Sequence, residues 1–431
     1  MEHNDTIFAP STAVGGAIAV LRVSGPGACG VMHALTGKAL TPRMLTYAPL
    51  RYSGEHLDDS MAVWFPAPNS YSGEDMLELH CHGGIGTVRR VSEALLDLGA
   101  RPAEGGEFTK RAFLNGKMDL TQAEAVMDLI NAQADSSLRA ALHQLGGSIG
   151  RMLRATEETI LDARSAVEAA IDYPDETEED VYAALPQQIE DAIREIDGLL
   201  SHSQQGRFLR EGVRTVILGR PNVGKSSLFN ALLGEDRAIV TSVAGTTRDV
   251  LDECTAWNGV SVRLMDTAGL REASDEAESI GIDRARRALH YADLLLIVLD
   301  GSVPLTPEDD ALLEETRAFR RIVISNKSDL GTVAADLAVS CKTGEGLETL
   351  KTRITSVAGT GELDTTCITN LRHIRALEAA RQALMHASSQ TEPDCIATDL
   401  REASHHLGTI TGTDVDEKLL DRIFENFCVG K

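Results

Sequence analysis

Residues 219–226 read Gly-Arg-Pro-Asn-Val-Gly-Lys-Ser and match the pattern G-x-x-x-x-G-K-[ST]. A strand-like run, 214–218, precedes them, and a helix-like run, 227–233, follows. Glycines let backbone N–H groups approach a chain of phosphates, the lysine reaches the outer phosphates, and the hydroxyl can bind Mg²⁺. The stretch therefore predicts a phosphate-binding loop between a strand and a helix of an α/β domain.

Three further motifs follow, each after a predicted strand. Residues 266–269 read Asp-Thr-Ala-Gly and suit a water-bound Mg²⁺ and the γ-phosphate. Residues 326–329 read Asn-Lys-Ser-Asp, and the Asp329 carboxylate can accept both the N1–H and the amine of guanine, an arrangement that adenine lacks. Residues 340–342, Ser-Cys-Lys, lie where a last loop would close over the base. This order of motifs predicts GTP as the nucleotide.

Residues 245–249, Gly-Thr-Thr-Arg-Asp, lie between the first two motifs and offer hydroxyls to the metal and the γ-phosphate. The residues predicted to bind the nucleotide are Asn222, Val223, Gly224, Lys225, Ser226, Ser227, Thr241, Ser242, Val243, Ala244, Gly245, Thr246, Thr247, Asp266, Thr267, Ala268, Gly269, Asn326, Lys327, Asp329, Ser340, Cys341 and Lys342.

These motifs contain no obvious group that would orient the attacking water or supply positive charge to the transferring phosphoryl group. Leu270 occupies the position where small GTPases carry a water-orienting glutamine, and an apolar side chain cannot orient water. Four arginines lie nearby without a fixed role: Arg220, Arg248, Arg271 and Arg284. A monovalent cation at Asn222 is one source of positive charge. The water could be oriented by a carboxylate among Glu272, Asp275, Glu276 and Glu278, although an acidic loop that merely keeps the surface soluble is an equally plain interpretation.

Composition limits the class of protein. The 431 residues include 41 Lys and Arg against 65 Asp and Glu, a formal charge of −24, and 43% are hydrophobic. These values exclude a disordered or fibrous chain, and the length predicts several domains. The acidic excess disfavours binding of nucleic acid through the average field. Seven scattered cysteines without a C-x-x-C pair, no signal sequence and no long apolar run predict a reduced, cytoplasmic protein that does not enter membranes.

The periodicity changes three times along the chain and predicts an interrupted architecture. Residues 1–117 read as an α+β domain, 118–212 as helical, 213–368 as an α/β domain, and 369–431 as helical again. The simplest organisation is a discontinuous all-helical domain, 118–212 with 369–431, into which a Ras-like P-loop domain is inserted. The acidic stretch 172–180 is predicted to be a solvated loop that interrupts the helices.

Further motifs extend over the whole chain. They read G-E-D-x-L-E-L at 73–79, F-L-N-G-K-x-D-L at 113–120, G-R-P-N-V-G-K-S-S at 219–227, D-T-A-G-L-R-E at 266–272 and F-C-V-G-K at 427–431. In these motifs the sequence closely resembles the bacterial tRNA-modification GTPase family MnmE (TrmE). The resemblance implies a folate-binding and dimerising domain at 1–117, the discontinuous helical domain, and an inserted GTPase domain.

The resemblance also implies roles for particular residues. Glu278, Asn222 and Lys225 would be catalytic, with Glu278 orienting the water. Asn222, Thr241, Val243 and Thr246 would bind K⁺, and Ser226 and Thr247 would bind Mg²⁺. Arg22, Glu78, Lys117 and Lys431 would line a site for a tetrahydrofolate derivative, either 5-formyl- or methylene-tetrahydrofolate.

The reaction implied by the resemblance adds an aminomethyl or carboxymethylaminomethyl group at C5 of the wobble uridine (U34) of certain tRNAs. Potassium-dependent pairing of the GTPase domains of a homodimer would trigger hydrolysis of GTP. A flavoprotein partner of the MnmG type would bring FAD and form a heterotetramer. The sequence departs from the family pattern at 80–82, His-Cys-His, and at Cys341.

Other interpretations stay open at this stage. A ribosome-assembly GTPase acting as an RNA-binding switch would carry an added GXXG RNA-binding domain, and a membrane-remodelling GTPase an amphipathic basic stretch; neither is evident. His80 and His82 could form part of a metal pair or simply lie on a surface strand. Cys428 could be a nucleophile toward uridine C6 or a small residue that packs the tail.

Overall fold

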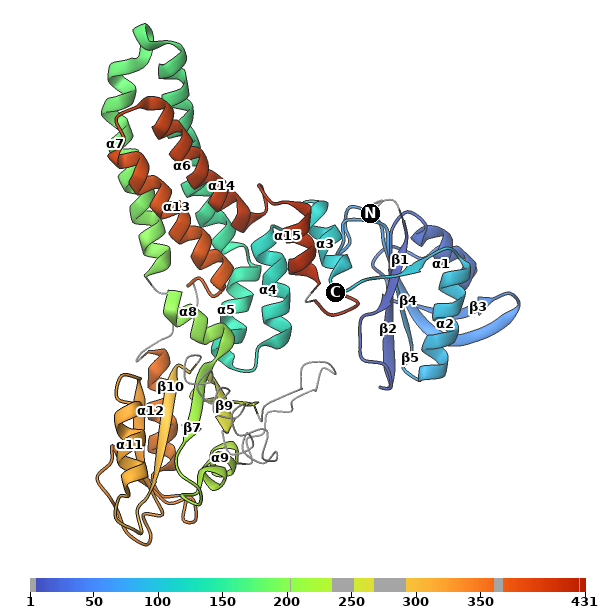
Figure 1. Ribbon diagram of the computed structural model, residues 1–431. Coiled ribbons are helices and arrows are strands. Elements are labelled where there is room, and N and C mark those ends of the chain that lie inside the picture. Colours follow the sequence, from blue (N-terminus) through green and yellow to red (C-terminus); the bar gives the residue numbers. More distant parts are fainter. Residues whose placement is uncertain (1–4, 202, 235–251, 267–291, 360–366, 426) are drawn as a thin grey trace, which may run out of the picture. The chain divides into compact units, whose positions relative to one another are not determined.

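The computed structural model describes residues 5–201, 203–234, 252–266, 292–359, 367–425 and 427–431 (Figure 1). Within helices and strands, the side chains of 174–182, 204, 252 and 266 are also left undescribed. The chain divides into two compact units. The first unit comprises Met1–Met127, Leu145–Glu158 and Ser404–Lys431, and the second comprises Asp128–Gln144 and Thr159–Ala403.

The first unit contains a six-stranded sheet with strand order β3-β4-β5-β2-β1-β6. Its strands are β1 (Ile7–Pro10), β2 (Ile18–Ser24), β3 (Thr46–Tyr52), β4 (Glu55–Phe65), β5 (Met76–His82) and β6 (Arg101–Pro102). Neighbours are antiparallel except β1 and β6, which are parallel. This arrangement fits the α+β pattern expected for the N-terminal region.

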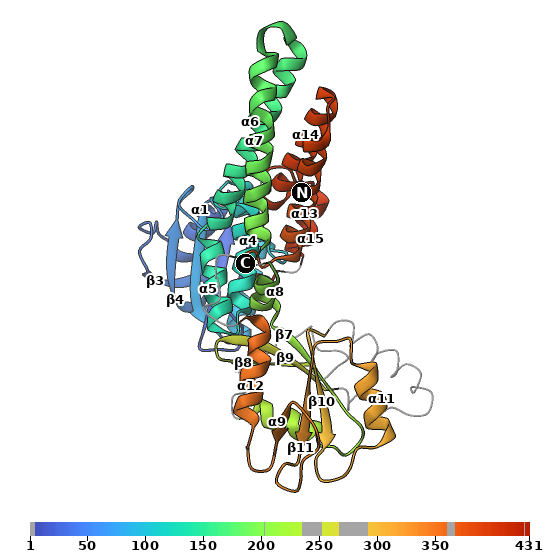
Figure 2. The ribbon, with the colours of Figure 1, turned by 90° about the vertical axis from the view of Figure 1, so that its left-hand side faces the viewer.

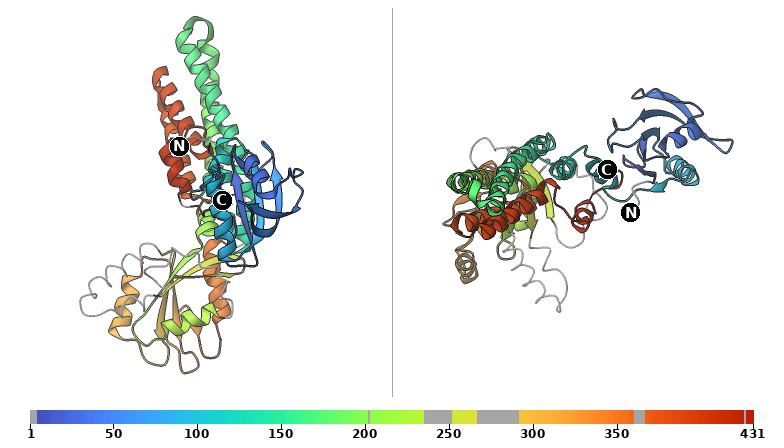
Figure 3. Two further views of the ribbon diagram at one scale, coloured as in Figure 1. Left: turned by 90° about the vertical axis from the view of Figure 1, so that its right-hand side faces the viewer. Right: turned by 90° about the horizontal axis from the view of Figure 1, so that it is seen from above.

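Helices α1 (Ala28–Thr36) and α2 (Ile85–Asp97) cover one face of this sheet (Figure 3). Their buried side chains share one core with alternate residues of the central strands, such as Leu21 of β2 and Leu79 of β5. Because side chains alternate along a strand, the intervening residues point to the other face. Arg22 and Glu78 are such residues and lie directly opposite each other in the β2–β5 register.

The first unit also contains α3 (Glu107–Leu114), most of α4 (Leu120–Asn131) and α15 (Glu417–Phe424). The start of α6 (Ser148–Asp172) and the end of α14 (Pro393–Thr411) belong to it as well. Leu120, Ala123, Leu420 and Phe424 form a small apolar core with Phe427. The apolar residues at the start of α4 therefore pack against the C-terminal helix α15.

The C-terminal tail returns to the N-terminal sheet. Val429 forms an isolated antiparallel bridge with Gly105, and the carbonyl of Lys431 accepts a hydrogen bond from Phe108 N at 3.2 Å. Gly430 has a φ of 94°, and a Cβ there would lie 2.2 Å from the carbonyl oxygen of Pro10. Only glycine fits this close approach, so the last residues are an integral part of the first unit.

The second unit contains a sheet with strand order β12-β11-β10-β7-β9-β8. Its strands are β7 (Val213–Leu218), β8 (Asp252–Trp257), β9 (Val260–Asp266), β10 (Leu294–Asp300), β11 (Arg321–Asn326) and β12 (Leu337–Val339). All pairs are parallel except β8 with β9. Side chains of the central strands are buried on both faces, as the continuous apolar run in β10 predicts.

Helices cover both faces of this sheet. The helices are α9 (Lys225–Leu233), α11 (Pro307–Glu315) and α12 (Leu347–Thr355), followed by the short 3₁₀ helix η2 (Ser356–Ala358). α9 and α12 pack into one core and α11 into the other, so α11 and α12 lie on opposite sides of the strands (Figure 2). The strands and the helix predicted around the phosphate loop are confirmed within about two residues.

The remaining helices are α5 (Asp135–Leu145), α6 (Ser148–Asp172), α7 (Pro174–Leu200), α8 (Ser203–Glu211), α13 (Leu371–Ser389) and α14 (Pro393–Thr411). α13 packs along α7. Within the second unit, Arg207 of α8 forms an ion pair with Asp293, and Ser136 of α5 donates to the carbonyl of Gly259. These contacts join α8 to the residue before β10 and α5 to the residue before β9.

The prediction of an acidic loop at 172–180 is wrong, because α7 already begins at Pro174. Proline at the first position of a helix loses no hydrogen bond, and its fixed φ suits the helix. Acidic residues in a first turn interact favourably with the positive end of the helix dipole. The same composition that suggested a solvated loop thus also suits a helix start.

In the part of the chain described above, no helix is both long enough and apolar enough to cross a bilayer.

Candidate functional site

The phosphate-binding loop runs from the end of β7 to the start of α9. Gly224 has a φ of 98°, and a Cβ on it would lie 2.3 Å from Asn326 Nδ2. That amide nitrogen donates to the carbonyl oxygen of Val223 at 2.9 Å. Asn326 is buried, so the loop and the Asn-Lys-Ser-Asp motif are joined by a buried hydrogen bond for which the glycine leaves room.

The same loop orients the residues predicted to meet the phosphates. Lys225 Nζ donates to the carbonyl oxygen of Arg220 at 2.9 Å. Asn222 adopts a left-handed backbone with a φ of 64°, and its side chain is exposed. Ser226 and Ser227 lie in the exposed first turn of α9. A helix N-terminus with hydroxyls and a lysine is suited to an anion with a bound divalent cation.

The loops predicted to recognise the base, which we call the base-recognition loops, lie beside the phosphate loop. Asp329 Oδ1 accepts a hydrogen bond from Ser340 Oγ at 2.8 Å, which orients that carboxylate. Cys341 Sγ donates to Asn326 Oδ1 at 3.3 Å, and Lys342 is exposed. The structure thus brings the motifs at 219–226, 326–329 and 340–342 into one cluster.

Lys327 connects two of these loops and has a partner that the sequence analysis missed. Its Nζ donates to the carbonyl oxygen of Asn222 at 3.1 Å and pairs with Asp300 Oδ2 at 2.5 Å. Burial by itself raises the pKa of the Asp300 carboxyl, but hydrogen bonds from Lys327 and Ser302 lower that pKa to about 2. An aspartate at the carboxyl end of an apolar parallel strand was the available signal.

Many of the predicted nucleotide and metal residues lie outside the described residues. They are Thr241, Ser242, Val243, Ala244, Gly245, Thr246, Thr247, Thr267, Ala268, Gly269 and Glu278. The same holds for Leu270, Glu272, Asp275, Glu276 and three of the four arginines named above, Arg248, Arg271 and Arg284. Asp266 ends β9, but its side chain is not described.

Arg220 is the one arginine of that group within the described residues. Its Nε lies 3.0 Å from Asp309 Oδ2, and the Asp309 side chain is 1% exposed. The guanidinium therefore has a buried carboxylate as its partner.

Apart from the nucleotide loops, a cavity of about 420 Å³ lies at the N-terminal sheet. Its lining comprises Arg22, Arg43, Phe65, Asn69, Ser70, Tyr71, Met76 and Glu78. Arg22 donates to Glu78 Oε1 from Nε at 3.1 Å and from Nη2 at 2.9 Å. The guanidinium carbon lies 5.0 Å from the Tyr71 ring centre and 5.7 Å from that of Phe108. Two rings and a carboxylate thus hold the guanidinium in place.

The carboxylate of this cavity is ionised at neutral pH. His80, whose Nε2 lies 3.6 Å from Glu78 Oε2, contributes most to lowering the pKa of Glu78. Burial opposes this shift and Arg22 reinforces it. Burial raises the pKa of Tyr71, whose hydroxyl lies 2.8 Å from Thr109 Oγ1. A charged, hydrogen-bonding wall beside aromatic rings suits a planar ligand with polar edges.

The two lysines predicted for this site lie near it but outside its lining. Lys117 Nζ donates to the carbonyl oxygen of Pro68 at 3.0 Å, next to the lining residue Asn69. Lys431 is held through its carbonyl by Phe108, the residue whose ring faces Arg22. The tail therefore reaches this part of the first unit.

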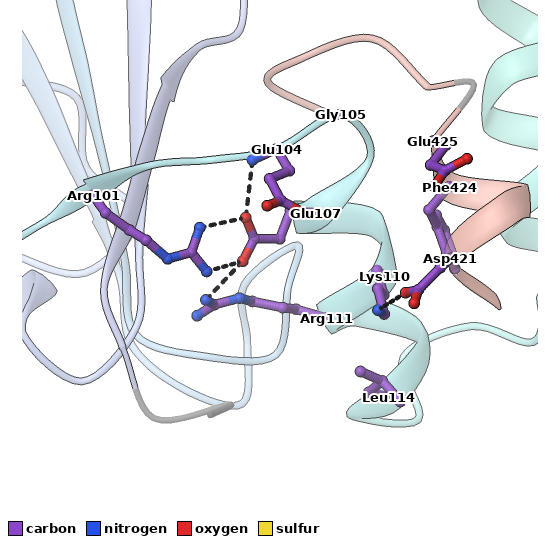
Figure 4. Close-up of a pocket in the computed structure, with 10 residues that line it drawn as sticks. All are labelled: Arg101, Glu104, Gly105, Glu107, Lys110, Arg111, Leu114, Asp421, Phe424 and Glu425. Atoms are coloured by element: carbon purple, nitrogen blue, oxygen red, sulfur yellow. Dashed lines mark hydrogen bonds and ion pairs between the residues drawn. The ribbon is translucent and has the colours of Figure 1, made fainter. Parts of the chain in front are cut away.

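Another cavity, of about 300 Å³, lies between α3 and α15 (Figure 4). Its charged residues are paired in part: Arg101 and Arg111 share the Glu107 carboxylate, and Lys110 pairs with Asp421 at 2.6 Å. Burial raises the pKa of Glu107 by itself, but the hydrogen bonds from Arg101, Glu104 N and Arg111 lower it overall. These ion pairs connect α3 with the sheet and with α15.

The other candidate residues have ordinary surroundings. His82 Nδ1 lies 2.8 Å from Asp58 Oδ1, and no group of three or more metal-ligating side chains occurs among the described residues. The backbone carbonyl of Cys428 accepts from Gly106 N and Lys431 N, and its side chain is half-buried.

Two family models match the chain. Residues 6–117 match a model described as "GTP-binding protein TrmE N-terminus", and residues 120–428 match one described as "MnmE helical domain".

Curated relatives match over almost their whole length. The protein "tRNA modification GTPase MnmE" of Akkermansia muciniphila is 44% identical over 446 residues, which covers 99% of each chain. Relatives with the same name in Geobacillus thermodenitrificans and Lactiplantibacillus plantarum are 44% and 42% identical and cover at least 98% of each chain. Among solved structures, the G domain of the T. maritima FeoB iron transporter is 28% identical and covers 34% of this chain and 98% of that one. Its TM-score of 0.25 carries no further conclusion.

Proposed function

Because the chain belongs to the family of tRNA modification GTPases named MnmE, and so is a GTP hydrolase that acts in tRNA modification, we propose that it modifies the wobble uridine of certain tRNAs. The added group would be an aminomethyl or carboxymethylaminomethyl group at C5. The observation that carries the proposal is the presence, on one chain, of guanine-type nucleotide loops and a separate cavity with a charged and aromatic lining.

The proposal includes a domain organisation. Residues 1–117 would bind the folate and dimerise, 118–212 with 369–431 would form the discontinuous helical domain, and 213–368 would form the inserted GTPase domain. Its support is the element order, in which the helices α4–α8 and α13–α15 flank the second sheet along the chain.

For GTP hydrolysis we propose a requirement for potassium and magnesium. Asn222 would bind K⁺ with Thr241, Val243 and Thr246, and Ser226 with Thr247 would bind Mg²⁺. The support is the exposed amide of Asn222 on a left-handed backbone and the position of Ser226 in the first turn of α9. Potassium bound there would supply positive charge to the transferring phosphoryl group. Glu278 would orient the water, and Lys225 would bind the outer phosphates.

The cavity of about 420 Å³ is the proposed site for a tetrahydrofolate derivative, which would supply a one-carbon unit. The ionised Glu78 would accept hydrogen bonds from the pterin amines, and Arg22, Lys117 and Lys431 would bind anionic or carbonyl groups. Tyr71 and Phe65 would provide apolar contact to the ring system.

A flavoprotein of the MnmG type is the proposed partner, in a heterotetramer with a homodimer of this chain, and it would carry FAD. Such a partner would also supply basic surface for tRNA, because this chain has a formal charge of −24. The work of both proteins on tRNA would take place in the cytoplasm.

GTP turnover in K⁺ and in Na⁺ tests the nucleotide part of the proposal. We expect turnover at least tenfold faster in K⁺ and a loss of this preference in Asn222→Ala, because a cation ligand is removed. The exposed Asn230→Ala on α9 is the matched control and keeps the preference. Equal rates of the parent in both salts would contradict the potassium site.

Nucleoside analysis of tRNA tests the modification. Cells without the protein should lack the C5 group on their wobble uridines, and the parent gene should restore it. Glu78→Gln should fail to restore it and should lose folate binding in a direct titration. Two results would contradict the proposal. Wobble uridines could keep the C5 group in cells without the protein, or they could lack it in cells that carry the intact gene. Full restoration by Cys428→Ser would exclude a nucleophilic role of that thiol.

A further inference from the structure

The connection from β10 to α11 carries an aspartate at each end, and each aspartate is paired with a different loop of the nucleotide site. Asp300 ends β10 and pairs with Lys327 of the base-recognition loop at 2.5 Å. Asp309 lies in the first turn of α11 and pairs with Arg220 of the phosphate loop. We call residues 300–309 the connecting segment.

The Arg220–Asp309 pair is well shielded from solvent. Arg220 Nε lies 3.1 Å from Oδ1 and 3.0 Å from Oδ2 of Asp309. The Asp309 side chain is 1% exposed, whereas that of Arg220 is 24% exposed. A carboxylate this deeply buried needs a cation, so removal of the guanidinium leaves an uncompensated charge inside the protein.

Asp309 also holds the start of α11. Its Oδ2 accepts from Thr306 N at 3.0 Å and from Thr306 Oγ1 at 2.9 Å, and Asp309 N donates back to Thr306 Oγ1 at 3.4 Å. This reciprocal capping box fixes the carboxylate relative to the helix. Arg220 therefore pairs with a carboxylate whose position is fixed at the start of α11.

The contacts close a ring around the nucleotide loops. From Asp309 the ring passes to Arg220, along the phosphate loop to Asn222, whose carbonyl accepts from Lys327 Nζ at 3.1 Å, and from Lys327 to Asp300. The connecting segment joins Asp300 back to Asp309. The carbonyl of Arg220 is also the acceptor for Lys225 Nζ at 2.9 Å.

We propose that Arg220 and Asp309 are positioning residues for GTP, and that the connecting segment sets the spacing between the phosphate loop and the base-recognition loop. A nucleotide must touch both loops at once, so its affinity depends on that spacing. Neither side chain touches the nucleotide in this account; both act through the backbone of the phosphate loop. The proposal rests on the hydrolysis of GTP by this chain.

The test measures the release of a fluorescent mant-GDP and the kcat and KM for GTP in the full chain. Asp309→Asn and Arg220→Gln should each speed mant-GDP release and raise KM by about tenfold, the effect expected when a charge-assisted hydrogen bond is lost. kcat should stay within about twofold. The double variant should be no worse than either single variant, because both remove the same pair.

Two further variants separate loop positioning from plain stability. Thr306→Ala breaks the capping box and loosens the Asp309 carboxylate but keeps its charge opposite Arg220, so it should speed hydrogen exchange in α11 and change mant-GDP release much less than Asp309→Asn does. Asp310→Asn removes one negative charge at the neighbouring, exposed position of α11 and should change neither hydrogen exchange in α11 nor mant-GDP release. Arg220→Lys should recover part of the lost affinity, since it restores the charge but not the planar fork.

Parental release rates in Arg220→Gln would overturn the proposal. The proposal would also be overturned if Thr306→Ala released mant-GDP as fast as Asp309→Asn does, because the effect would then come from the stability of α11 alone. A parent chain that fails to bind mant-GDP or to hydrolyse GTP would contradict the proposed function itself, a result distinct from either of these.

Discussion

Gly224 and Asn326 approach each other closely where the phosphate loop meets the Asn-Lys-Ser-Asp motif. The Asn326 amide reaches the carbonyl of Val223 across the space that a side chain on residue 224 would need. A positive φ of 98° adds a second reason for glycine, because residues with a Cβ rarely adopt it. One hydrogen bond thus links the phosphate loop to the motif that is predicted to recognise the base.

Gly224→Ala should weaken mant-GTP binding by roughly tenfold or more, since either the loop or Asn326 must move. A direct fluorescence titration measures this. The matched control is Gly198→Ala in α7, where an added Cβ meets nothing within 4 Å. That change should raise helix stability by about 0.5–1 kcal/mol and leave binding unchanged. Parental affinity in Gly224→Ala would show that the loop tolerates a Cβ.

The Asp300–Lys327 pair gives a prediction about pH. The folded pKa of Asp300, about 2, is lower than the ordinary aspartate value, so the pair stabilises the protein above about pH 4 and loses this contribution as pH falls toward 2. Asp300→Asn should lower the free energy of unfolding by roughly 1–2 kcal/mol at pH 7. The difference from the parent should stay constant from pH 8 to 5 and shrink below pH 4.

Urea unfolding measures this difference. In a Trp64→Phe background, Trp257 of β8 is the single tryptophan and reports on the second sheet. The exposed Asp310→Asn serves as the control for a general change in charge. A difference that grows as the pH falls would contradict the assignment of the shifted pKa.

At the level of secondary-structure elements, α15 shows how a short helix is held in place. It begins with Asp416 as its N-cap, which accepts from Leu419 N at 2.7 Å. Leu420 and Phe424 face Leu120 and Ala123 of α4 in a small core. Lys110 of α3 adds an ion pair to Asp421 on its more exposed side. A helix of this length depends on such packing, since it is marginal alone.

Phe424→Ala should cost about 3–5 kcal/mol through lost burial and a cavity in this core. We expect hydrogen exchange to become faster in α15 and in the tail behind it, while the sheet of the second unit keeps its protection. Lys418→Ala, an exposed change on the same helix, is the control and should leave the exchange unaltered. Unchanged protection of α15 in Phe424→Ala would show that this core contributes little.

At the scale of the whole molecule, the two ends of the chain are built into one unit. Ser11 Oγ donates to the carbonyl of Gly430 at 3.1 Å, across a sequence separation of 419 residues. In the same tail, the carbonyl of Lys431 accepts a hydrogen bond from Phe108 N, beside the cavity that contains Arg22. The C-terminus therefore contributes to the surroundings of a site formed mainly by the N-terminal sheet.

Gly430→Ala should release the tail, because a Cβ would lie 2.2 Å from the carbonyl oxygen of Pro10 and the backbone has a positive φ. The half-buried thiol of Cys428 should then react with maleimide several-fold faster at neutral pH. Gly99→Ala, at an open position of similar φ, is the control and leaves the rate unchanged. GTP turnover of Gly430→Ala should stay at the parental level. A parental rate of labelling would show that the tail accommodates the methyl group.

Local patterns predicted much of this protein correctly. The strands around the phosphate loop were found because continuous apolar runs are typical of parallel strands buried on both faces. The phosphate and base motifs could be recognised because their residue spacing is set by the chemistry of one ligand, and the structure brings 219–226, 326–329 and 340–342 together, while their binding roles stay predictions. The acidic stretch at 172–180 was assigned wrongly, since charge alone does not distinguish a loop from the first turns of a helix.

Pairs of distant residues could not be found in the same way. Arg220 meets Asp309 across 89 residues, and Lys327 meets Asp300 across 27, only because β7, β10 and β11 lie side by side and their connections leave from the same edge of the sheet. The docking of the tail on β1 depends likewise on the folded first unit. Periodicity and motif spacing reflect interactions between near neighbours along the chain. Strand order determines which loops become neighbours in space, and it is the outcome of packing over the whole domain.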